Sequence, residues 1–247
     1  MSAKEAIEKY LRATGHASFS LKAALVDMDG VLYDSMRLHT AAWLRMATEI
    51  GIEATRDEFY LYEGMTGEAT INVLFNRAFG RDCTHQEAEE LYRRKSGYFV
   101  ELGAPAMMPG ALSMHTTLRD NGIKRVLVTG SAQGSVLERL SGDYPGIFPD
   151  GCRVTAHDVK RGKPHPEPYL KGMEIAACAP SECMVIENAP LGVKAGKAAG
   201  ALVVGVTTGP IPAQEMWAAG ADMVFPTMPA FAQALPQMID ELKNHGA

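Results

Sequence analysis

The sequence has little cysteine, no long apolar run and no excess of basic residues, and each absence argues against a class of protein. Its four cysteines include no Cys-x-x-Cys pair, which fits reduced thiols in a cytoplasmic protein better than a disulfide scaffold or a zinc finger. No apolar run approaches the ~18 residues that a membrane span needs. The 24 Lys and Arg against 29 Asp and Glu leave a net charge of −5 and no basic stripe, so we expect no nucleic-acid partner.

The chain does have enough apolar material for a full core. Hydrophobic residues make up 47% of its 247 residues, and there is no internal repeat or low-complexity segment. This length fits one large domain or a domain with an insert. The first nineteen residues, MSAKEAIEKYLRATGHASF, are too charged for a signal peptide. We expect them to form a short helix on the surface.

Short apolar runs recur along the chain, and each is followed by a loop and a helical pattern. Because continuous apolar runs without alternation are typical of strands buried on both faces, they predict a parallel sheet flanked by helices. Helical patterns over 111–122 and 190–200 complete the alternation of a doubly wound, Rossmann-like α/β fold. The predicted strands span 23–26, 124–128, 152–156, 183–186, 201–206 and 222–225.

One interval, from about residue 36 to residue 108, has helical patterns but no strand-like run. Apolar residues at helical spacing predict helices over 38–50 and 71–79, each ending at a glycine. Thr84-His85-Gln86-Glu87 is a capping box that opens a third helix. We therefore predict an all-helical cap domain, residues 36–106, inserted into a core formed by 1–35 and 107–247.

Polar side chains follow four of the predicted strands. In open parallel sheets, ligands bind beyond the carboxyl ends of the strands, so these side chains are expected to share one site. Acids, hydroxyls, a lysine and an amide together suit a phosphate and a divalent cation. In chain order the segments are Asp27-Met28-Asp29-Gly30, Thr129-Gly130-Ser131, Lys163-Pro164 and Glu187-Asn188.

The two acids after the first strand suggest a division of labour. At strand geometry, Asp27 and Asp29 project to the same side. An ionised carboxylate needs no adjacent base to attack phosphorus, so Asp27 is the candidate nucleophile that would form an aspartyl phosphate. Asp29 would then protonate the leaving oxygen and later activate water. Lys163 would neutralise the charge that grows on the transferred group.

A phosphate and a carboxylate repel each other, so this chemistry needs a hard cation. Mg²⁺ takes oxygen ligands, and Glu187 and Asn188 would supply them together with Asp27. Thr129 and Ser131, with the N–H of Gly130, are expected where a helix begins and could hold phosphate oxygens.

Each of these motifs also has an ordinary structural interpretation. Asp-x-Asp-Gly is often a solvated turn, and Thr-Gly-Ser after a strand is often a helix cap. A lysine before proline is usually on the surface, and a Glu-Asn pair is usually part of a polar loop. Their order, each after a predicted strand, favours a functional site over coincidence.

The four segments DMDGVLYDS, VTGSA, GKPHPEPYL and VIENAPLGVKAG resemble the motifs of the haloacid dehalogenase superfamily, and most closely its β-phosphoglucomutase-like branch. The resemblance implies a helical C1 cap, Mg²⁺ as cofactor and a small phosphorylated metabolite, such as a sugar phosphate, as substrate. It also implies that the backbone carbonyl of Asp29 binds Mg²⁺ and that His39 supports proton transfer at Asp29. Ser35, His39 and Gly64 are the candidate cap and substrate residues. The acid at Asp29 argues against a dehalogenase or a phosphonatase.

Three positions depart from the pattern of the mutases in that branch. Gly67 stands where a cap arginine is expected, Ala132 where a lysine is expected, and Asn188 where an aspartate is common. Losing both cations removes two candidates for charge-assisted bonds to a second phosphate, each worth roughly 1.5–3 kcal/mol.

We therefore predict a Mg²⁺-dependent phosphatase that can function as a monomer. The first alternative is a β-phosphoglucomutase-type isomerase, in which Arg37, Arg77 or another cap cation replaces the missing ones. The second alternative is a phosphate-binding module without turnover, against which the full set of four motifs argues.

Overall fold

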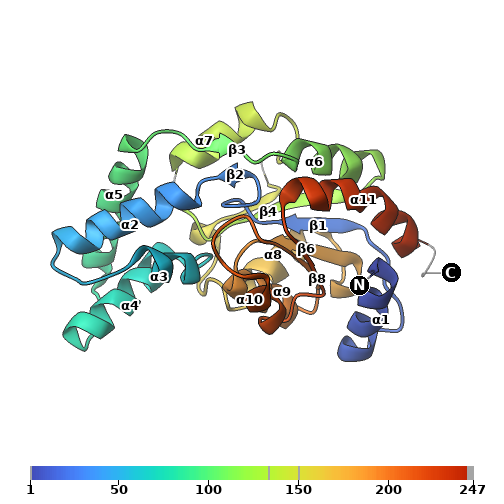
Figure 1. The fold of residues 1–247 in the computed structure, drawn as a ribbon, viewed down its shortest axis with the longest axis horizontal. Coiled ribbons are helices and arrows are strands. Elements are labelled where there is room, and N and C mark those ends of the chain that lie inside the picture. Colours follow the sequence, from blue (N-terminus) through green and yellow to red (C-terminus); the bar gives the residue numbers. More distant parts are fainter. Residues whose placement is uncertain (1, 133, 150, 244–247) are drawn as a thin grey trace.

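The core of the molecule is a six-stranded parallel sheet. The computed structural model describes residues 2–132, 134–149 and 151–243. Its strand order is β5-β4-β1-β6-β7-β8, and all neighbouring strands run parallel (Figure 1). This confirms the doubly wound α/β fold and a strand within each of the six predicted runs. The strands are β1 (Ala23–Val26), β4 (Lys124–Val128), β5 (Arg153–Val154), β6 (Cys183–Glu187), β7 (Leu202–Val206) and β8 (Met223–Phe225).

Helices cover both faces of the sheet, because successive residues of a buried strand point to opposite sides. Ala24 and Val26 of β1 join one apolar cluster, and Ala23 and Leu25 join the other. The helices of the first cluster are α1 (Ala3–Thr14), α6 (Ala111–Asp120), α7 (Gly134–Asp143) and α11 (Met228–Lys243). The helices of the second are α8 (Glu167–Ala176), α9 (Pro190–Ala198) and α10 (Ala213–Ala218). Short 3₁₀ helices span Ala156–Asp158 and Pro180–Glu182.

Helix α1 confirms the expectation of a helix at the start of the chain. It begins at a capping box formed by Ser2 and Glu5 and ends at Gly15, whose φ of 73° is left-handed. Its buried side chains, Ile7 and Tyr10 among them, pack in the same apolar cluster as α11.

Four helices form a separate layer, at the left of Figure 1. They are α2 (Met36–Glu49), α3 (Arg56–Leu61), α4 (Gly67–Phe79) and α5 (His85–Glu101). Trp43, Met46, Phe59, Leu74 and Leu91 belong to an apolar cluster of their own. Three of these helices match the predicted ones. Helix α3 was not predicted, although it also begins at a capping box, formed by Thr55 and Glu58.

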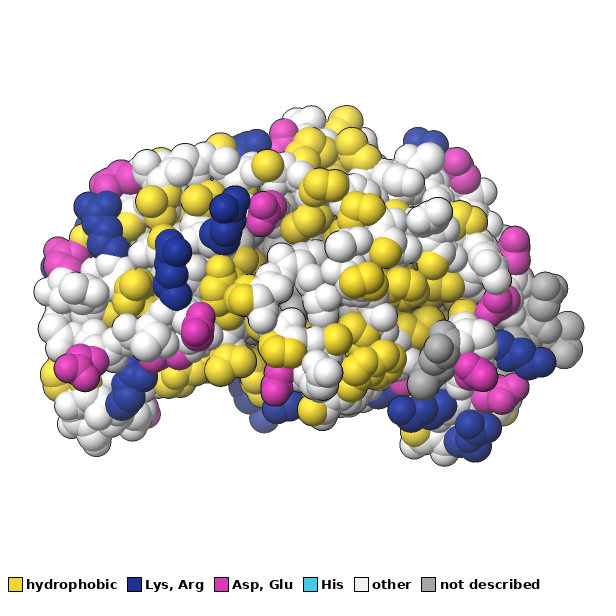
Figure 2. All heavy atoms as spheres, in the orientation of Figure 1, with side chains coloured by type: hydrophobic (Ala, Val, Ile, Leu, Met, Phe, Trp, Pro, Cys, Tyr) yellow, Lys and Arg dark blue, Asp and Glu magenta, His cyan; other side chains and the backbone are white. Residues whose placement is uncertain are grey.

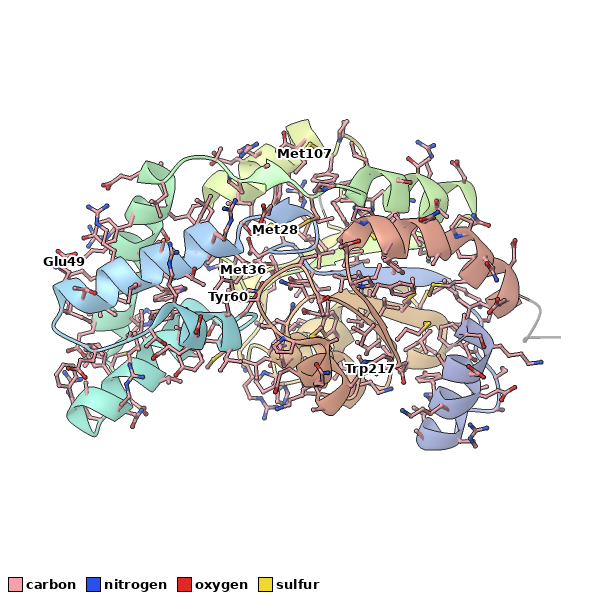
Figure 3. All side chains as sticks on the ribbon, viewed as in Figure 1. Met28, Met36, Glu49, Tyr60, Met107 and Trp217 are labelled. Atoms are coloured by element: carbon pink, nitrogen blue, oxygen red, sulfur yellow. The ribbon has the colours of Figure 1, made fainter. Side chains whose placement is uncertain are left out.

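Two short strands join the helical layer to the core. β2 (Tyr33–Asp34) and β3 (Ala106–Met107) pair in antiparallel fashion, so the chain enters and leaves the layer through adjacent segments. The expectation of no strand between 36 and 108 is therefore wrong at β3, because a two-residue strand has no periodicity to detect. Near this junction, Met36 and Tyr60 lie close together and form a small apolar cluster with Ile211 of the core (Figure 3).

The surface carries both signs of charge. On the face drawn in Figure 2, Lys and Arg side chains are interspersed with Asp and Glu. In the described part of the chain, every helix is too short or too polar to cross a membrane.

Candidate active site

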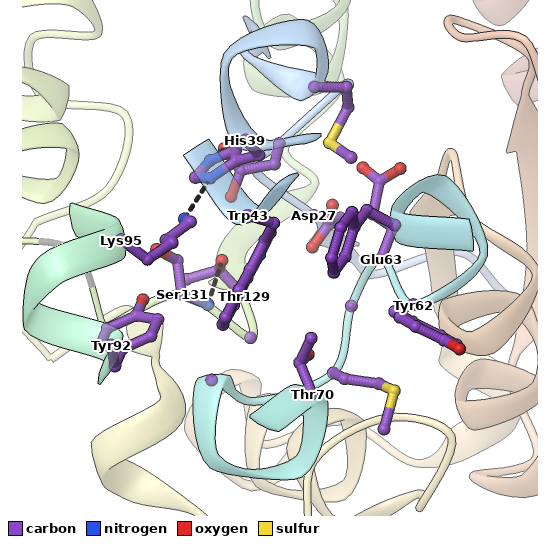
Figure 4. Close-up of a pocket in the computed structure, with 17 residues that line it drawn as sticks. Asp27, His39, Trp43, Tyr62, Glu63, Thr70, Tyr92, Lys95, Thr129 and Ser131 are labelled. Atoms are coloured by element: carbon purple, nitrogen blue, oxygen red, sulfur yellow. Dashed lines mark hydrogen bonds and ion pairs between the residues drawn. The ribbon is translucent and has the colours of Figure 1, made fainter. Parts of the chain in front are cut away.

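The polar segments singled out in the sequence meet where the sheet faces the helical layer. Asp27 directly follows β1, Thr129 directly follows β4, and Glu187 is the last residue of β6. Lys163 comes from the loop that precedes α8. Above them lies a cavity whose other walls come from the helical layer (Figure 4).

Lys163 connects the two carboxylates at the floor of the site. Its Nζ donates to Asp27 Oδ1 and to Glu187 Oε1, both at 2.6 Å, and to the carbonyl of Val128 at 3.2 Å. Burial and the neighbouring Glu187 raise the pKa of Asp27, and Lys163 opposes this rise. Burial also works against the charge of Lys163, but the two carboxylates outweigh it and raise the pKa of the ammonium. Lys163 is therefore a fixed cation that holds Asp27 in place.

Asp29 is held by two donors from the start of α2. Its Oδ1 accepts from Ser35 Oγ at 2.6 Å and from His39 Nε2 at 2.9 Å. Burial alone would raise the pKa of Asp29, but His39 and Ser35 more than offset this and the pKa lies below its ordinary value. His39, which the resemblance links to proton transfer at Asp29, and Ser35, a candidate cap and substrate residue, thus both contact the candidate acid–base residue.

Lys95 of α5 completes this chain of groups. Its Nζ lies 2.6 Å from His39 Nδ1, which fixes a neutral imidazole that accepts at Nδ1 and donates from Nε2 to Asp29. Burial, and then the charge of Lys95, lower the pKa of His39. Burial also lowers the pKa of Lys95, to about 7. Nothing in the sequence spacing singles out Lys95, since it lies 56 residues from His39.

The predicted phosphate-binding segment lines the cavity together with Gly64. The backbone N–H of Ser131 donates to Thr129 Oγ1 at 3.0 Å. A Cβ on Gly130 would lie 2.5 Å from the carbonyl oxygen of Gly64, so this loop touches the loop between α3 and α4. Among the described residues α7 begins at Gly134, so the segment lies just before a helix.

The predicted metal ligands do not form one cluster of carboxylates. Glu187 Oε1 accepts from Lys163 and Tyr169, and Oε2 accepts from the backbone N–H groups of Asn188 and Ala189. The side chain of Asp29 faces His39 and Ser35. Within residues 2–132, 134–149 and 151–243, no three His, Cys, Asp or Glu side chains are grouped so that they could hold a metal.

Asn188 is the predicted ligand with a free oxygen. Its Oδ1 is buried and has no hydrogen-bond partner, whereas its Nδ2 donates to Glu63 Oε1 at 2.7 Å. A buried acceptor without a partner is costly, and an oxygen of this kind fits a cation or its bound water. Glu63 lies next to the predicted Gly64, but nothing in the sequence distinguished it from a loop acid.

Tyr92 of α5 fills the space near two of the departures from the mutase pattern. A Cβ on Gly67 would lie 2.2 Å from Tyr92 Cδ2, well inside contact distance. The hydroxyl of Tyr92 accepts from the backbone N–H of Ala132 at 3.2 Å. The aromatic ring of Tyr92 thus lies against residue 67, and its hydroxyl reaches the backbone of residue 132. Trp43 stacks on Phe59, with ring centroids 6.0 Å apart, and also lines the cavity.

Comparison with known proteins identifies the family. The model of the haloacid dehalogenase-like hydrolases matches residues 21–200, so the chain belongs to this family of enzymes. It is similar to hexitol phosphatase A of Escherichia coli (strain K12), with 32% identity over 75% of this chain and 82% of the relative. It is also similar to beta-phosphoglucomutase of Bacillus subtilis (strain 168), with 30% identity over 83% of this chain and 88% of the relative.

A solved structure extends the likeness to the whole chain. The protein described as "Putative beta-phosphoglucomutase from Bacteroides vulgatus" is 42% identical, has a TM-score of 0.94 and is matched over 98% of both chains. The relatives therefore include proteins named as phosphatases and proteins named as mutases, and the choice between the two activities depends on the site itself.

Proposed function

We propose that this protein is a Mg²⁺-dependent phosphatase of small phosphate monoesters, such as sugar phosphates, and that it works through an aspartyl phosphate on Asp27. Asp27 Oδ1 is held by Lys163, and Oδ2 accepts no hydrogen bond from the described residues. Oδ2 is thus the oxygen available to attack phosphorus. Lys163, which touches Asp27, balances negative charge as the phosphoryl group is transferred.

Asp29 supplies the proton transfers in this proposal. It protonates the leaving oxygen of the ester, and its carboxylate then takes a proton from the water that attacks the aspartyl phosphate. Ser35 and His39 both donate to the same oxygen, Oδ1, and therefore keep Oδ2 directed away from α2. The pKa of Asp29 lies below its ordinary value, and the negative charge of a bound phosphate would raise it, so that the same carboxyl group would act first as an acid and then as a base.

The side chains of the site fit a magnesium ion. We propose that Asp27, the backbone carbonyl of Asp29 and Oδ1 of Asn188 hold it, with Glu187 acting through its bonds to Lys163 and to the backbone of Asn188. The unpartnered, buried Oδ1 of Asn188 supports this assignment. A bound Mg²⁺ would neutralise phosphate charge and lower the pKa of Asp27.

The position of Tyr92 is the observation that favours hydrolysis over isomerisation. A mutase must hold a second phosphate while its intermediate reorients, and residues 67 and 132 are where the resemblance puts the cations for it. Tyr92 covers Gly67 and bonds the backbone of Ala132, so the space for that phosphate is filled by an aromatic ring. Water, and not a second hydroxyl of the substrate, is then the acceptor of the phosphoryl group.

An isomerase of the β-phosphoglucomutase type is the second candidate. It is supported by the 42% identity to the Bacteroides vulgatus protein over nearly the whole chain. The buried ammonium of Lys95 lines the same cavity and would have to serve the second phosphate. In the present arrangement Lys95 is bonded to His39.

Phosphate release from a panel of phosphate monoesters tests the proposal. With Mg²⁺ present, we expect the wild-type protein to release inorganic phosphate from at least one sugar or polyol phosphate. Asp27→Asn, which preserves shape, is expected to lower the rate on the order of 10³-fold or more, because the amide is not a nucleophile. Undiminished release by Asp27→Asn would contradict the aspartyl phosphate mechanism.

A further inference from the structure

We propose that Glu63, from the loop between α3 and α4, is a positioning residue that turns the amide of Asn188 so that its carbonyl oxygen faces the magnesium ion. This inference rests on the proposed function, since it concerns the cation of that site. Neither residue type is explained by the mechanism itself. A buried glutamate with no catalytic task and an asparagine in place of an aspartate are found in direct contact.

The contact joins the helical layer to the core. Asn188 Nδ2 donates to Glu63 Oε1 at 2.7 Å, across 125 residues of sequence. Glu63 is 8% exposed and Asn188 is 4% exposed, so water does not compete for the bond. Figure 4 shows Glu63 on the wall of the cavity near Asp27.

The chemistry of the pair determines which way the amide points. Oε1 of Glu63 is the acceptor in this contact, and an accepting carboxyl oxygen selects the NH₂ end of the Asn188 amide. The oxygen end is then left without a partner, as the structure shows for Oδ1. An amide in the opposite orientation would direct two N–H bonds at the cation and would present the oxygen of Asn188 to the oxygen of Glu63. Glu63 therefore converts an ambiguous side chain into a defined oxygen ligand.

Steric fit reinforces this orientation. A Cβ on Gly30 would lie 1.9 Å from Asn188 Nδ2, so the amide packs directly over the backbone of Gly30. Gly30 also has a φ of +79°, which other L residues rarely adopt. The amide is thus confined between Gly30 and Glu63, with Oδ1 as its remaining free atom.

The pair also explains why asparagine is compatible with this position. An aspartate at 188 would bring two carboxylates within hydrogen-bond distance in a buried place that already contains Asp27 and Glu187. The core has an amide at position 188 where an aspartate is common, and the helical layer supplies an acid, Glu63, beside it. A consequence is that the ligand from Asn188 is fully oriented only when the layer is docked on the core.

A double-mutant cycle on Mg²⁺ binding tests this proposal without reference to turnover. Mg²⁺ affinity is measured by titration calorimetry, with and without inorganic phosphate, for Glu63→Met and Glu63→Gln in the natural and the Asn188→Asp background. In the natural background we expect Glu63→Met to weaken Mg²⁺ binding about fivefold to tenfold, the effect of losing one buried hydrogen bond. Glu63→Gln keeps an oxygen that can accept from Asn188 and should retain most of the affinity.

In the Asn188→Asp background, substitutions at Glu63 should change the Mg²⁺ affinity in the opposite direction. There both substitutions remove a repulsive carboxylate, and both should tighten Mg²⁺ binding. The proposal is overturned if removing the carboxylate at 63 changes the affinity equally in the two backgrounds under both conditions. If Glu63→Met does not fold, Glu63→Gln in the two backgrounds provides the same comparison. A protein that binds Mg²⁺ in this pattern but releases no phosphate would contradict the proposed function and leave the Glu63 proposal standing.

Discussion

Tyr92 is the residue on which the choice between hydrolysis and isomerisation depends most. It contacts the positions of both missing cations, Gly67 and Ala132, from a helix far away in sequence. The departures at 67 and 132 were visible in the sequence as absences. The sequence did not show that Tyr92 fills the space beside them. The path of α5 over the site follows from packing of the helical layer and not from a local sequence pattern.

Gly67→Ala tests whether Tyr92 occupies this space. Helix propensity favours alanine over glycine, but the added Cβ would lie 2.2 Å from the Tyr92 ring. We expect overpacking to prevail and to cost about 1–3 kcal/mol of the free energy of unfolding, measured by urea denaturation. Gly97→Ala is the matched control. Gly97 lies within α5 with nothing within 4 Å of a Cβ, and alanine there should stabilise by about 0.5–1 kcal/mol. A Gly67→Ala protein as stable as the Gly97→Ala protein would contradict the contact.

Lys95 gives the site a pH signature. Burial lowers its pKa from the ordinary value of 10.5 to about 7, with Asp29 and His39 as its polar neighbours. Below pH 7 both the folded and the unfolded chain bear the proton, so the cost of burying the charge is present in full. Between pH 7 and 10.5 the unfolded chain binds more protons than the folded protein, and the cost is relieved as the pH rises.

We therefore expect Lys95→Met to raise the Tm, relative to wild type, more at pH 6 than at pH 9. The substitution also removes the donor to His39 Nδ1. This loss shifts the Tm change by a similar amount at pH 6 and at pH 9, so the difference between the two pH values remains. The same substitution at the exposed Lys160 is the control for losing a surface lysine. A gain in Tm that grew from pH 6 to pH 9 would contradict a lowered pKa of Lys95.

Among the elements, two helices of the helical layer show how a hydroxyl side chain serves two different purposes at a helix start. Thr84 opens α5 with a full capping box, in which its side chain accepts from the N–H of Glu87. Ser35 occupies the equivalent position of α2 but makes no capping bond and donates to Asp29 instead. An N-cap serine that leaves its own helix uncapped is available for the site.

Thr84→Ala and Ser35→Ala should separate stability from turnover. We expect Thr84→Ala to cost about 1 kcal/mol of the free energy of unfolding through the lost cap and to leave kcat/KM unchanged. Ser35→Ala should lower kcat/KM and displace its basic limb toward higher pH, because Asp29 must be protonated to act as the general acid and loses a donor that favours its charged form. Unfolding curves and pH profiles of both variants check this. An unchanged pH profile in Ser35→Ala would contradict the role given to Ser35.

The elements that the sequence predicted well are those with a strong local signal. The strands β1, β6 and β7 are buried throughout, and β4 is buried over its last three residues. The helices α4, α5 and α9 have clear starts or glycine ends. Helix α3 has only six residues and β3 only two, too few to establish a period. The core site follows from the strand ends, whereas Glu63, Lys95 and Tyr92 reach it only through the docking of one layer on another.

Across the whole molecule, the helical layer lies closed over the core. The remaining cavity measures about 60 Å³. A space of this size holds a few water molecules and is too small for a sugar phosphate. The adjacent connections at β2 and β3 suggest where a hinge would act. We therefore propose that residues 36–106 act as a cap that opens to admit substrate and release product.

A reversible disulfide tests this motion. A Cβ on Gly162 would lie 3.7 Å from Cβ of Thr66, within the ~3.5–4.5 Å that a disulfide spans. We expect Thr66→Cys/Gly162→Cys to lose phosphate release when oxidised and to regain it with a thiol reductant. The two single variants, oxidised in parallel, are the controls. Full turnover by the oxidised double variant, with the cross-link verified by mass spectrometry, would show that the cap need not open.

Phosphorus NMR distinguishes hydrolysis through Asp27 from phosphoryl transfer that needs a site for a second phosphate. The protein is mixed with Mg²⁺, β-glucose 1-phosphate and a trace of glucose 1,6-bisphosphate, with Asp27→Asn as the control, and the phosphorus signals are followed over time. We expect growth of inorganic phosphate with the wild-type protein and no change with Asp27→Asn. Growth of glucose 6-phosphate without inorganic phosphate would contradict this expectation, since some other cation would then hold the second phosphate despite Tyr92.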